Sequence, residues 1–142
     1  AKFDEPEKVQ LLFSAHSIPE SYVREGDPYL DQTTATMERI MDRLGRKNSY
    51  QLSFQSKIGP VKWLEPATNT VLVEYGKRGV ANVLVVPISF VSEHIETLYE
   101  LDILYQNVAK DAGIPNFRRV PALNSDPLFI RALADIVQES LQ

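Results

Sequence analysis

The sequence predicts an α/β domain in which a four-stranded parallel sheet carries helices on both faces. Short apolar runs alternate with segments of helical periodicity four times along the chain, which is typical of repeated strand-helix units. The length of 142 residues suits one domain with a sizeable core. A hydrophobic content of 44% and a charged content of 24% are those of a soluble globular protein. We therefore expect a single domain over residues 1–142.

The first strand is predicted over residues 9–15, an apolar run that ends at His16. Pro19 breaks the strand, because proline donates no backbone hydrogen bond. A helix is predicted over residues 30–44, where apolar residues recur at helical spacing before the stop at Gly45. The apolar residues at this spacing are Met37, Ile40, Met41 and Leu44, and we expect Met37 and Met41 to fill the core.

The second half of the chain continues the alternation. Residues 83–86 are all apolar and mostly β-branched, as in a central strand buried on both faces. Ser92 is a suitable cap for the helix that follows, and Asp126 with Pro127 is a strong start for the last helix, whose apolar side we expect to face the core. The predicted elements are a strand over 50–54, a loop over 55–60, a helix over 66–79, a strand over 80–87, a helix over 92–110, a strand over 117–120 and a helix over 127–141.

A candidate site lies where the third strand ends. In a helix, Glu93, Glu96 and Glu100 fall at i, i+3 and i+7 on one face, where they repel one another and attract a cation. A solvated acidic face is the alternative explanation of this pattern. If the strand order is 2-1-3-4, however, the ends of strands 1 and 3 flank the point where open parallel sheets bind ligands, and His16 faces Glu96. The convergence of two ionisable groups favours a site, although a lone histidine is more often structural.

Several classes of function are disfavoured. The net charge of −4 argues against nucleic acid as a partner. The absence of cysteine excludes a disulfide, a thiolate zinc site and a cysteine-held iron–sulfur cluster, so any metal would need nitrogen or oxygen ligands. No glycine-rich phosphate loop and no Gly-x-Ser-x-Gly motif follows a strand. Proton transfer and metal handling remain.

The sequence also gives expectations about where the protein is located and whether the chain is part of a longer one. No apolar run approaches the length of a membrane span and no signal-like segment opens the chain, so we expect an intracellular protein. The chain begins at Ala1 rather than Met, which suggests a trimmed chain or part of a longer one.

Four motifs stand out at the predicted strand ends and the segments after them: Ser14-Ala-His-Ser-Ile-Pro19, Gln55-Ser-Lys-Ile-Gly-Pro60, Trp63-Leu64 and Pro87-Ile-Ser-Phe-Val-Ser-Glu-His-Ile-Glu-Thr-Leu-Tyr-Glu-Leu-Asp102. They closely resemble motifs of ferrochelatases. The resemblance covers nearly the whole chain, but only the carboxyl-terminal of that enzyme's two similar domains. It implies a three-layer, Rossmann-like (chelatase-like) fold and a role in heme biosynthesis, the insertion of ferrous iron into protoporphyrin IX to give protoheme.

The resemblance also implies roles for individual residues. His16 resembles the catalytic histidine of the family, which either takes pyrrole protons or binds the metal. Glu96 is similar to the glutamate opposite it, and His94 to a histidine that helps to hold that side of the site. Glu100 continues an acidic line that handles metal or protons, and Glu93 stands where many members carry aspartate.

A wall for the porphyrin is implied by the same comparison. Trp63 resembles the tryptophan that packs near the macrocycle, and we expect Ser17 and Ile18 beside it. Because the cleft of the family lies between two domains, the amino-terminal domain that is absent here would supply the second wall.

Three hypotheses follow from the resemblance. The chain is the catalytic half of a ferrochelatase, a porphyrin- or metal-binding module without turnover, or a half-sized tetrapyrrole chelatase that forms a homodimer. The expected partners are protoporphyrin IX and ferrous iron, with no further cofactor, no iron–sulfur cluster and no nucleic acid. The expected location is the cytoplasm, or the matrix side of the mitochondrion in a eukaryote, with a peripheral membrane contact left open.

Overall fold

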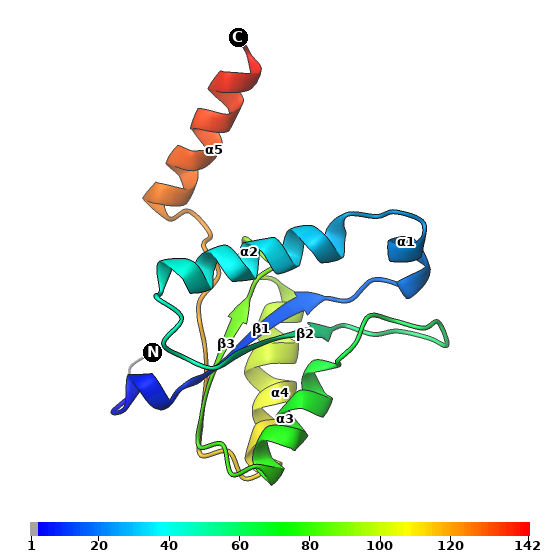
Figure 1. Cartoon of the computed structure of the whole chain (residues 1–142), viewed down its shortest axis with the longest axis vertical. Coiled ribbons are helices and arrows are strands. Elements are labelled where there is room, and N and C mark those ends of the chain that lie inside the picture. Colours follow the sequence, from blue (N-terminus) through cyan, green and yellow to red (C-terminus); the bar gives the residue numbers. More distant parts are fainter. Residues whose placement is uncertain (1–2) are drawn as a thin grey trace.

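A single parallel sheet organises the computed structural model, which describes residues 3–142 (Figure 1). Its strand order is β2-β1-β3-β4, which confirms the predicted order and fold class. The first and third strands lie side by side at its centre. The strands are β1 (Gln10–His16), β2 (Tyr50–Gln55), β3 (Asn82–Pro87) and β4 (Asn116–Arg119).

Helices cover both faces of the sheet, as predicted. One long helix, α2, lies over one face, and α3 and α4 lie together on the other (Figure 1). No helix within residues 3–142 has both the length and the apolar character needed to cross a bilayer. The helical segments are η1 (Pro6–Lys8), α1 (Glu20–Arg24), α2 (Tyr29–Arg43), α3 (Thr68–Lys77), η2 (Glu96–Leu104), α4 (Tyr105–Asp111) and α5 (Pro127–Ser140).

The core forms because alternate residues of β1 face opposite layers. Leu12 packs with residues of α3 and α4, whereas Phe13 packs with residues of α2. Met37 and Met41 are buried on the α2 side, which confirms that they fill the core. Apolar packing therefore covers both faces of β1, and the polar groups of the site gather at its carboxyl end.

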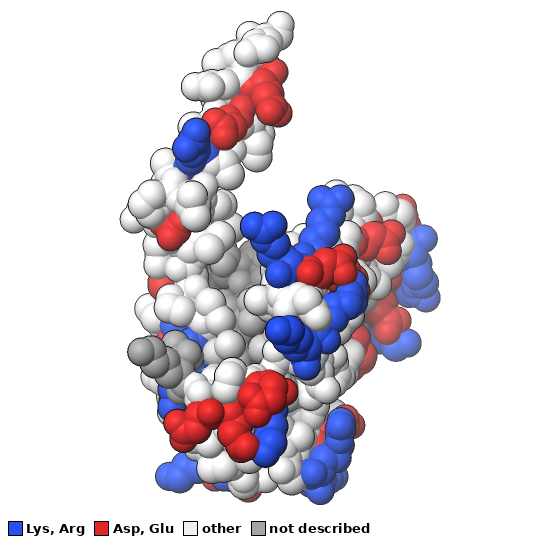
Figure 2. Space-filling model, turned by 60° about the vertical axis from the view of Figure 1, so that its left-hand side comes forward, with Lys and Arg blue, Asp and Glu red and all other residues white. Residues whose placement is uncertain are grey.

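The closing helix α5 differs from the prediction. Asp126 caps it as predicted, because its carboxylate accepts hydrogen bonds from the amides of Leu128 and Phe129. The helix nevertheless projects away from the sheet (Figure 1), and most of its visible surface belongs to uncharged residues (Figure 2). None of its residues is buried, so the expected packing of its apolar side on the core is wrong. The exposed apolar residues are Leu128, Ile130, Leu133, Ile136, Val137 and Leu141.

The acidic segment is also not the single helix predicted over residues 92–110. The π-helix η2 begins after Ile95, which makes no side-chain cap, so Ser92 is not the cap residue. The amide of Tyr105 bonds to the carbonyl of Glu100, five residues back. π-helices are rare and concentrate at functional sites. The prediction failed because hydrophobic spacing does not distinguish this wider turn from an α-helix.

The close approach of α3 and α4 gives a first testable prediction. A Cβ atom at Gly76 would lie 2.1 Å from the backbone carbonyl oxygen of Ala112. We expect Gly76→Ala to lower the free energy of unfolding by about 1–3 kcal/mol through overpacking, despite the better helix propensity of alanine. Urea denaturation measures the change. Val73→Ala, at an exposed position of α3, is the control and should stay within about 0.5 kcal/mol of the unsubstituted chain. If Gly76→Ala were as stable as the unsubstituted chain, α3 and α4 would be able to move apart without loss of stability.

Candidate functional site

The sheet brings residues from distant parts of the chain to one edge. His16, the last residue of β1, is in register with Gln55 of β2, and Ser14 is in register with Pro87 of β3. The amide of His16 donates to the Ser89 hydroxyl over 2.8 Å, and the Tyr29 hydroxyl donates to the carbonyl oxygen of His16 over 2.7 Å. The backbone of His16 is therefore fixed on both sides of the strand end.

The side chain of His16 faces Glu96, as predicted. The distance between His16 Nε2 and Glu96 Oε2 is 3.3 Å, and both side chains are about one third exposed, at 38% and 34%. His16 Nδ1 lies 2.7 Å from the carbonyl oxygen of Ser17. Because a carbonyl only accepts hydrogen bonds, Nδ1 carries a proton and the basic lone pair of a neutral ring is at Nε2. A hydrogen bond to Glu96 then needs one further proton, on Nε2 or on the carboxylate.

Glu100 lies on the same side of η2 as Glu96, and one hydroxyl lies between the two carboxylates. Ser56 Oγ is 3.2 Å from Glu96 Oε2 and 2.7 Å from Glu100 Oε2. The side-chain Nε2 of Gln55 donates to Glu100 Oε2 over 2.9 Å. These donors hold two like charges close together, in place of the cation expected from sequence.

A buried row of polar side chains supports Gln55 from behind. Gln55 Oε1 accepts a hydrogen bond of 2.7 Å from Ser14, and the hydroxyl of Thr68 lies within hydrogen-bond distance of both Ser14 and Ser53. No buried side-chain nitrogen or oxygen in the described part of the chain lacks a partner. Sequence reasoning missed these residues, although a glutamine at a strand end and a serine inside an apolar run were visible signals.

Glu93 does not share the face of Glu96 and Glu100, so the expected common stripe of three carboxylates is wrong. It lies before η2, and its carboxylate accepts hydrogen bonds from Arg119 (2.8 Å), the amide of Ala122 (2.9 Å) and the hydroxyl of Thr97 (2.8 Å). Burial alone would raise the pKa of Glu93, but these three donors outweigh it and lower the pKa to about 2. Its predicted role as a metal ligand is not favoured by this geometry.

His94 lies near the site but does not touch His16. Its ring is tilted against Phe90, with 4.5 Å between ring centroids, and Phe90 contacts the edge of the His16 ring at 6.2 Å. The amide of Glu96 donates to His94 Nδ1 over 3.3 Å. His94 thus contacts the start of the helix that carries Glu96, and Phe90 contacts both histidine rings.

The residues expected to form a porphyrin wall have different environments. Loop 56–67 runs beside the segment after β1, where the amide of Leu64 donates to the carbonyl of Ile18 and Trp63 pairs with Pro19. Trp63 and Ile18 are partly buried, and the indole N–H of Trp63 donates to the carbonyl of Ile58. Ser17 is completely buried, so its side chain offers no surface to a macrocycle, against the expectation.

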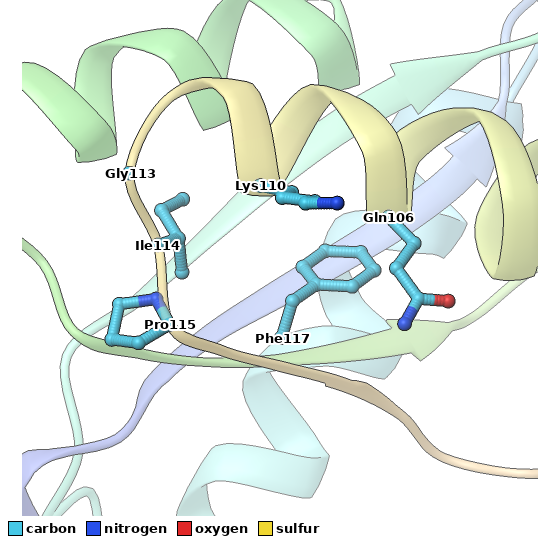
Figure 3. A pocket seen from close by; sticks show the side chains of 6 residues that line it. All are labelled: Gln106, Lys110, Gly113, Ile114, Pro115 and Phe117. Carbon is cyan, nitrogen blue, oxygen red and sulfur yellow. The ribbon is translucent and has the colours of Figure 1, made fainter.

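One pocket opens at this edge of the sheet, and another lies elsewhere. Residues 3–142 contain no group of three or more acidic or histidine side chains arranged to hold a metal ion. A pocket of about 240 Å³ opens beside Glu100 and Ser56, with Lys57 and Asn69 in its lining. A larger pocket, of about 370 Å³, lies elsewhere, between the end of α4 and β4 (Figure 3), and neither His16 nor Glu96 lines it.

The chain is closely similar in sequence to known ferrochelatases. The chain is 54% identical over 142 residues to a ferrochelatase of Picosynechococcus sp. (strain ATCC 27264 / PCC 7002 / PR-6), covering 99% of the chain and 37% of that protein. It is 59% identical over 140 residues to a ferrochelatase of Synechococcus sp. (strain JA-2-3B'a(2-13)), covering 98% of the chain and 41% of the relative. The chain therefore spans about two fifths of the length of these relatives.

The fold of this chain is similar to that of a solved structure. A cobalamin (vitamin B12) biosynthesis CbiX protein from Marinobacter aquaeolei VT8 aligns with a TM-score of 0.61 at 18% identity, over 94% of this chain and 97% of that one. This likeness concerns the fold alone. The sequence model of the ferrochelatase family matches residues 1–141, and the chain belongs to that family.

Proposed function

We propose that this chain is the half of a ferrochelatase that removes pyrrole protons and handles ferrous iron during its insertion into protoporphyrin IX. The observation that carries the proposal is the 3.3 Å pair of His16 Nε2 and Glu96 Oε2, which joins two residues 80 positions apart at the ligand-binding edge of a parallel sheet. Membership of the family supports the same reaction class.

Insertion requires a base because two pyrrole N–H protons must leave before the nitrogens can bind the metal. The carbonyl of Ser17 holds the Nδ1 proton of His16, which directs the basic nitrogen of the neutral ring toward Glu96 and the edge of the sheet. A proton taken up at Nε2 gives an imidazolium, which the Glu96 carboxylate stabilises. His16 is thus the proposed proton acceptor, and Glu96 is its acidic partner.

Ferrous iron is a substrate here, and it must exchange its water for nitrogen or oxygen ligands. Glu96 and Glu100 offer carboxylate oxygens on either side of the Ser56 hydroxyl, and the pocket of about 240 Å³ reaches Glu100 from the side of Lys57. We propose that iron, protons or both pass along the line formed by Glu96, Ser56 and Glu100. Because the four nitrogens of the macrocycle complete the coordination of iron, Glu96 and Glu100 need not supply a full set of metal ligands.

The porphyrin needs two walls, because a distorted macrocycle must be held from both sides. Trp63 and Ile18 are the proposed contacts on this chain. The second wall is proposed to come from the rest of a longer polypeptide, since the chain spans only about 37% of the length of its Picosynechococcus relative. The uncovered apolar side of α5 also supports a longer polypeptide, because such a surface is seldom left exposed in a complete protein.

The proton-acceptor role gives a second testable prediction. In a chimera in which this chain replaces the matching segment of the Picosynechococcus relative, His16→Ala is expected to slow iron insertion by at least about a hundredfold, because a positioned general base contributes that much. Absorbance of the metallated porphyrin measures the rate. The insertion rate of Glu96→Gln should also fall. Glu20→Gln, which alters a partly buried carboxylate that pairs with Lys62 and not with His16, should retain full activity. Retained insertion by His16→Ala, with unchanged circular dichroism, would contradict the assignment.

The two-wall argument gives a third prediction. The 142-residue chain alone should be monomeric and should insert iron at least about a hundredfold more slowly than the chimera, because one wall cannot hold the strained macrocycle in position. Light scattering and the insertion assay in the same buffer test both parts. Porphyrin binding without turnover fits this prediction. Rapid turnover with a dimeric mass would instead support a half-sized homodimeric chelatase.

A further inference from the structure

Arg119 is the last residue of β4, and its guanidinium is largely buried, with its side chain only 12% exposed. Its Nε and Nη2 atoms donate to the two oxygens of Asp102 over 2.6 and 2.7 Å. Its Nη1 atom donates to Glu93 over 2.8 Å. One cation therefore holds a carboxylate from before η2 and a carboxylate near the end of η2.

The contacts of Glu93 extend this cluster on both sides. The carboxylate accepts a hydrogen bond from the hydroxyl of Thr97, a buried residue of η2, and from the amide of Ala122 in the segment after β4. The amide of Glu93 donates to the side-chain oxygen of Asn124 over 2.9 Å. The start of η2 is thus fastened to the segment that follows β4, through Glu93.

The fastened residues and the site residues alternate along η2. Thr97, which bonds to Glu93, directly follows Glu96, which faces His16. Asp102, which bonds to Arg119, follows two positions after Glu100. If Glu93 or Asp102 shifts, η2 shifts with it, and Glu96 therefore moves relative to the imidazole ring of His16.

The charges explain why a cation is needed there. Four carboxylates lie between residues 93 and 102, and neighbouring like charges oppose the formation of η2. Arg119 binds two of them with charge-assisted hydrogen bonds, one of them bidentate. The two that it leaves, Glu96 and Glu100, are those that face Ser56 and the edge of the sheet.

We propose that Arg119 is a positioning residue that, through Glu93 and Asp102, fixes η2 so that Glu96 faces His16. The inference rests on the proposed function for its effect on catalysis, and on geometry alone for its effect on the His16–Glu96 pair. It also gives Glu93 a role in positioning η2 in place of direct metal binding.

Arg119→Lys in the chimera tests the inference, because lysine keeps the charge but cannot make the bidentate contact. We expect kcat to fall about tenfold to a hundredfold, the effect of a small misplacement, while KM for the porphyrin stays within about twofold. Arg118→Lys is the matched control on the same strand; Arg118 lies over the ring of Phe3 and should tolerate the change. Asp102→Asn, which removes one carboxylate at constant size, is the second variant and should lower kcat in the same way.

A readout without turnover separates this inference from the proposed function. In the 142-residue chain, the ring ¹⁵N resonances of His16 should move in Arg119→Lys in the direction that they move in Glu96→Gln, and should not move in Arg118→Lys. Unchanged His16 resonances and unchanged kcat in both Arg119→Lys and Asp102→Asn would overturn the positioning role. A chimera that inserts no iron without substitution would overturn the proposed function, whatever the resonances show.

Discussion

The parallel register of β1 with its two neighbours is the constraint on which the site depends. Because His16 pairs with Gln55 and Ser14 pairs with Pro87, three strands end at one edge, and the segments after them must run side by side. A slip of one residue would turn every side chain of β1 to the other face. The dry packing of Leu12 and Phe13 on opposite layers prevents that slip, so the core holds His16 in front of Glu96.

The second requirement is to hold four carboxylates, three in η2 and one just before it, close together despite their mutual repulsion. The structure divides them between two sets of donors. Arg119 binds Glu93 and Asp102 on one side, and hydrogen bonds from Gln55 and Ser56 restrain the other two. This division creates an electrostatic asymmetry. On one side of η2, the single guanidinium of Arg119 offsets one of the two carboxylate charges of Glu93 and Asp102. The other side keeps both carboxylate charges, where the proposed ferrous substrate would approach.

Sequence reasoning predicted what depends on periodicity and on strand order, which includes the sheet, its order and the meeting of His16 with Glu96. It did not predict the π-helical turn, because a helical pattern does not reveal the hydrogen-bond spacing of the backbone. It assigned Glu93 to the wrong face because it began the helix at Ser92, whereas η2 begins at Glu96 and Glu93 precedes it. Arg119 was missed because its partners lie 17 and 26 residues away along the chain, which no local pattern reports. The burial of Ser17 depends on the course of loop 56–67, which is equally non-local.

The place of α5 shows how a correct local prediction can fail in its tertiary setting. Its cap at Asp126 and its apolar spacing form a good helix, but a helix of this kind is stable mainly when its apolar face is covered. Within residues 3–142 nothing buries that face, and Leu84 and Val86 of β3 are also only partly covered. Both observations fit a domain that shares its surface with further polypeptide. Such further polypeptide would cover the apolar side of α5, and under the proposed function it would also supply the second wall for the porphyrin.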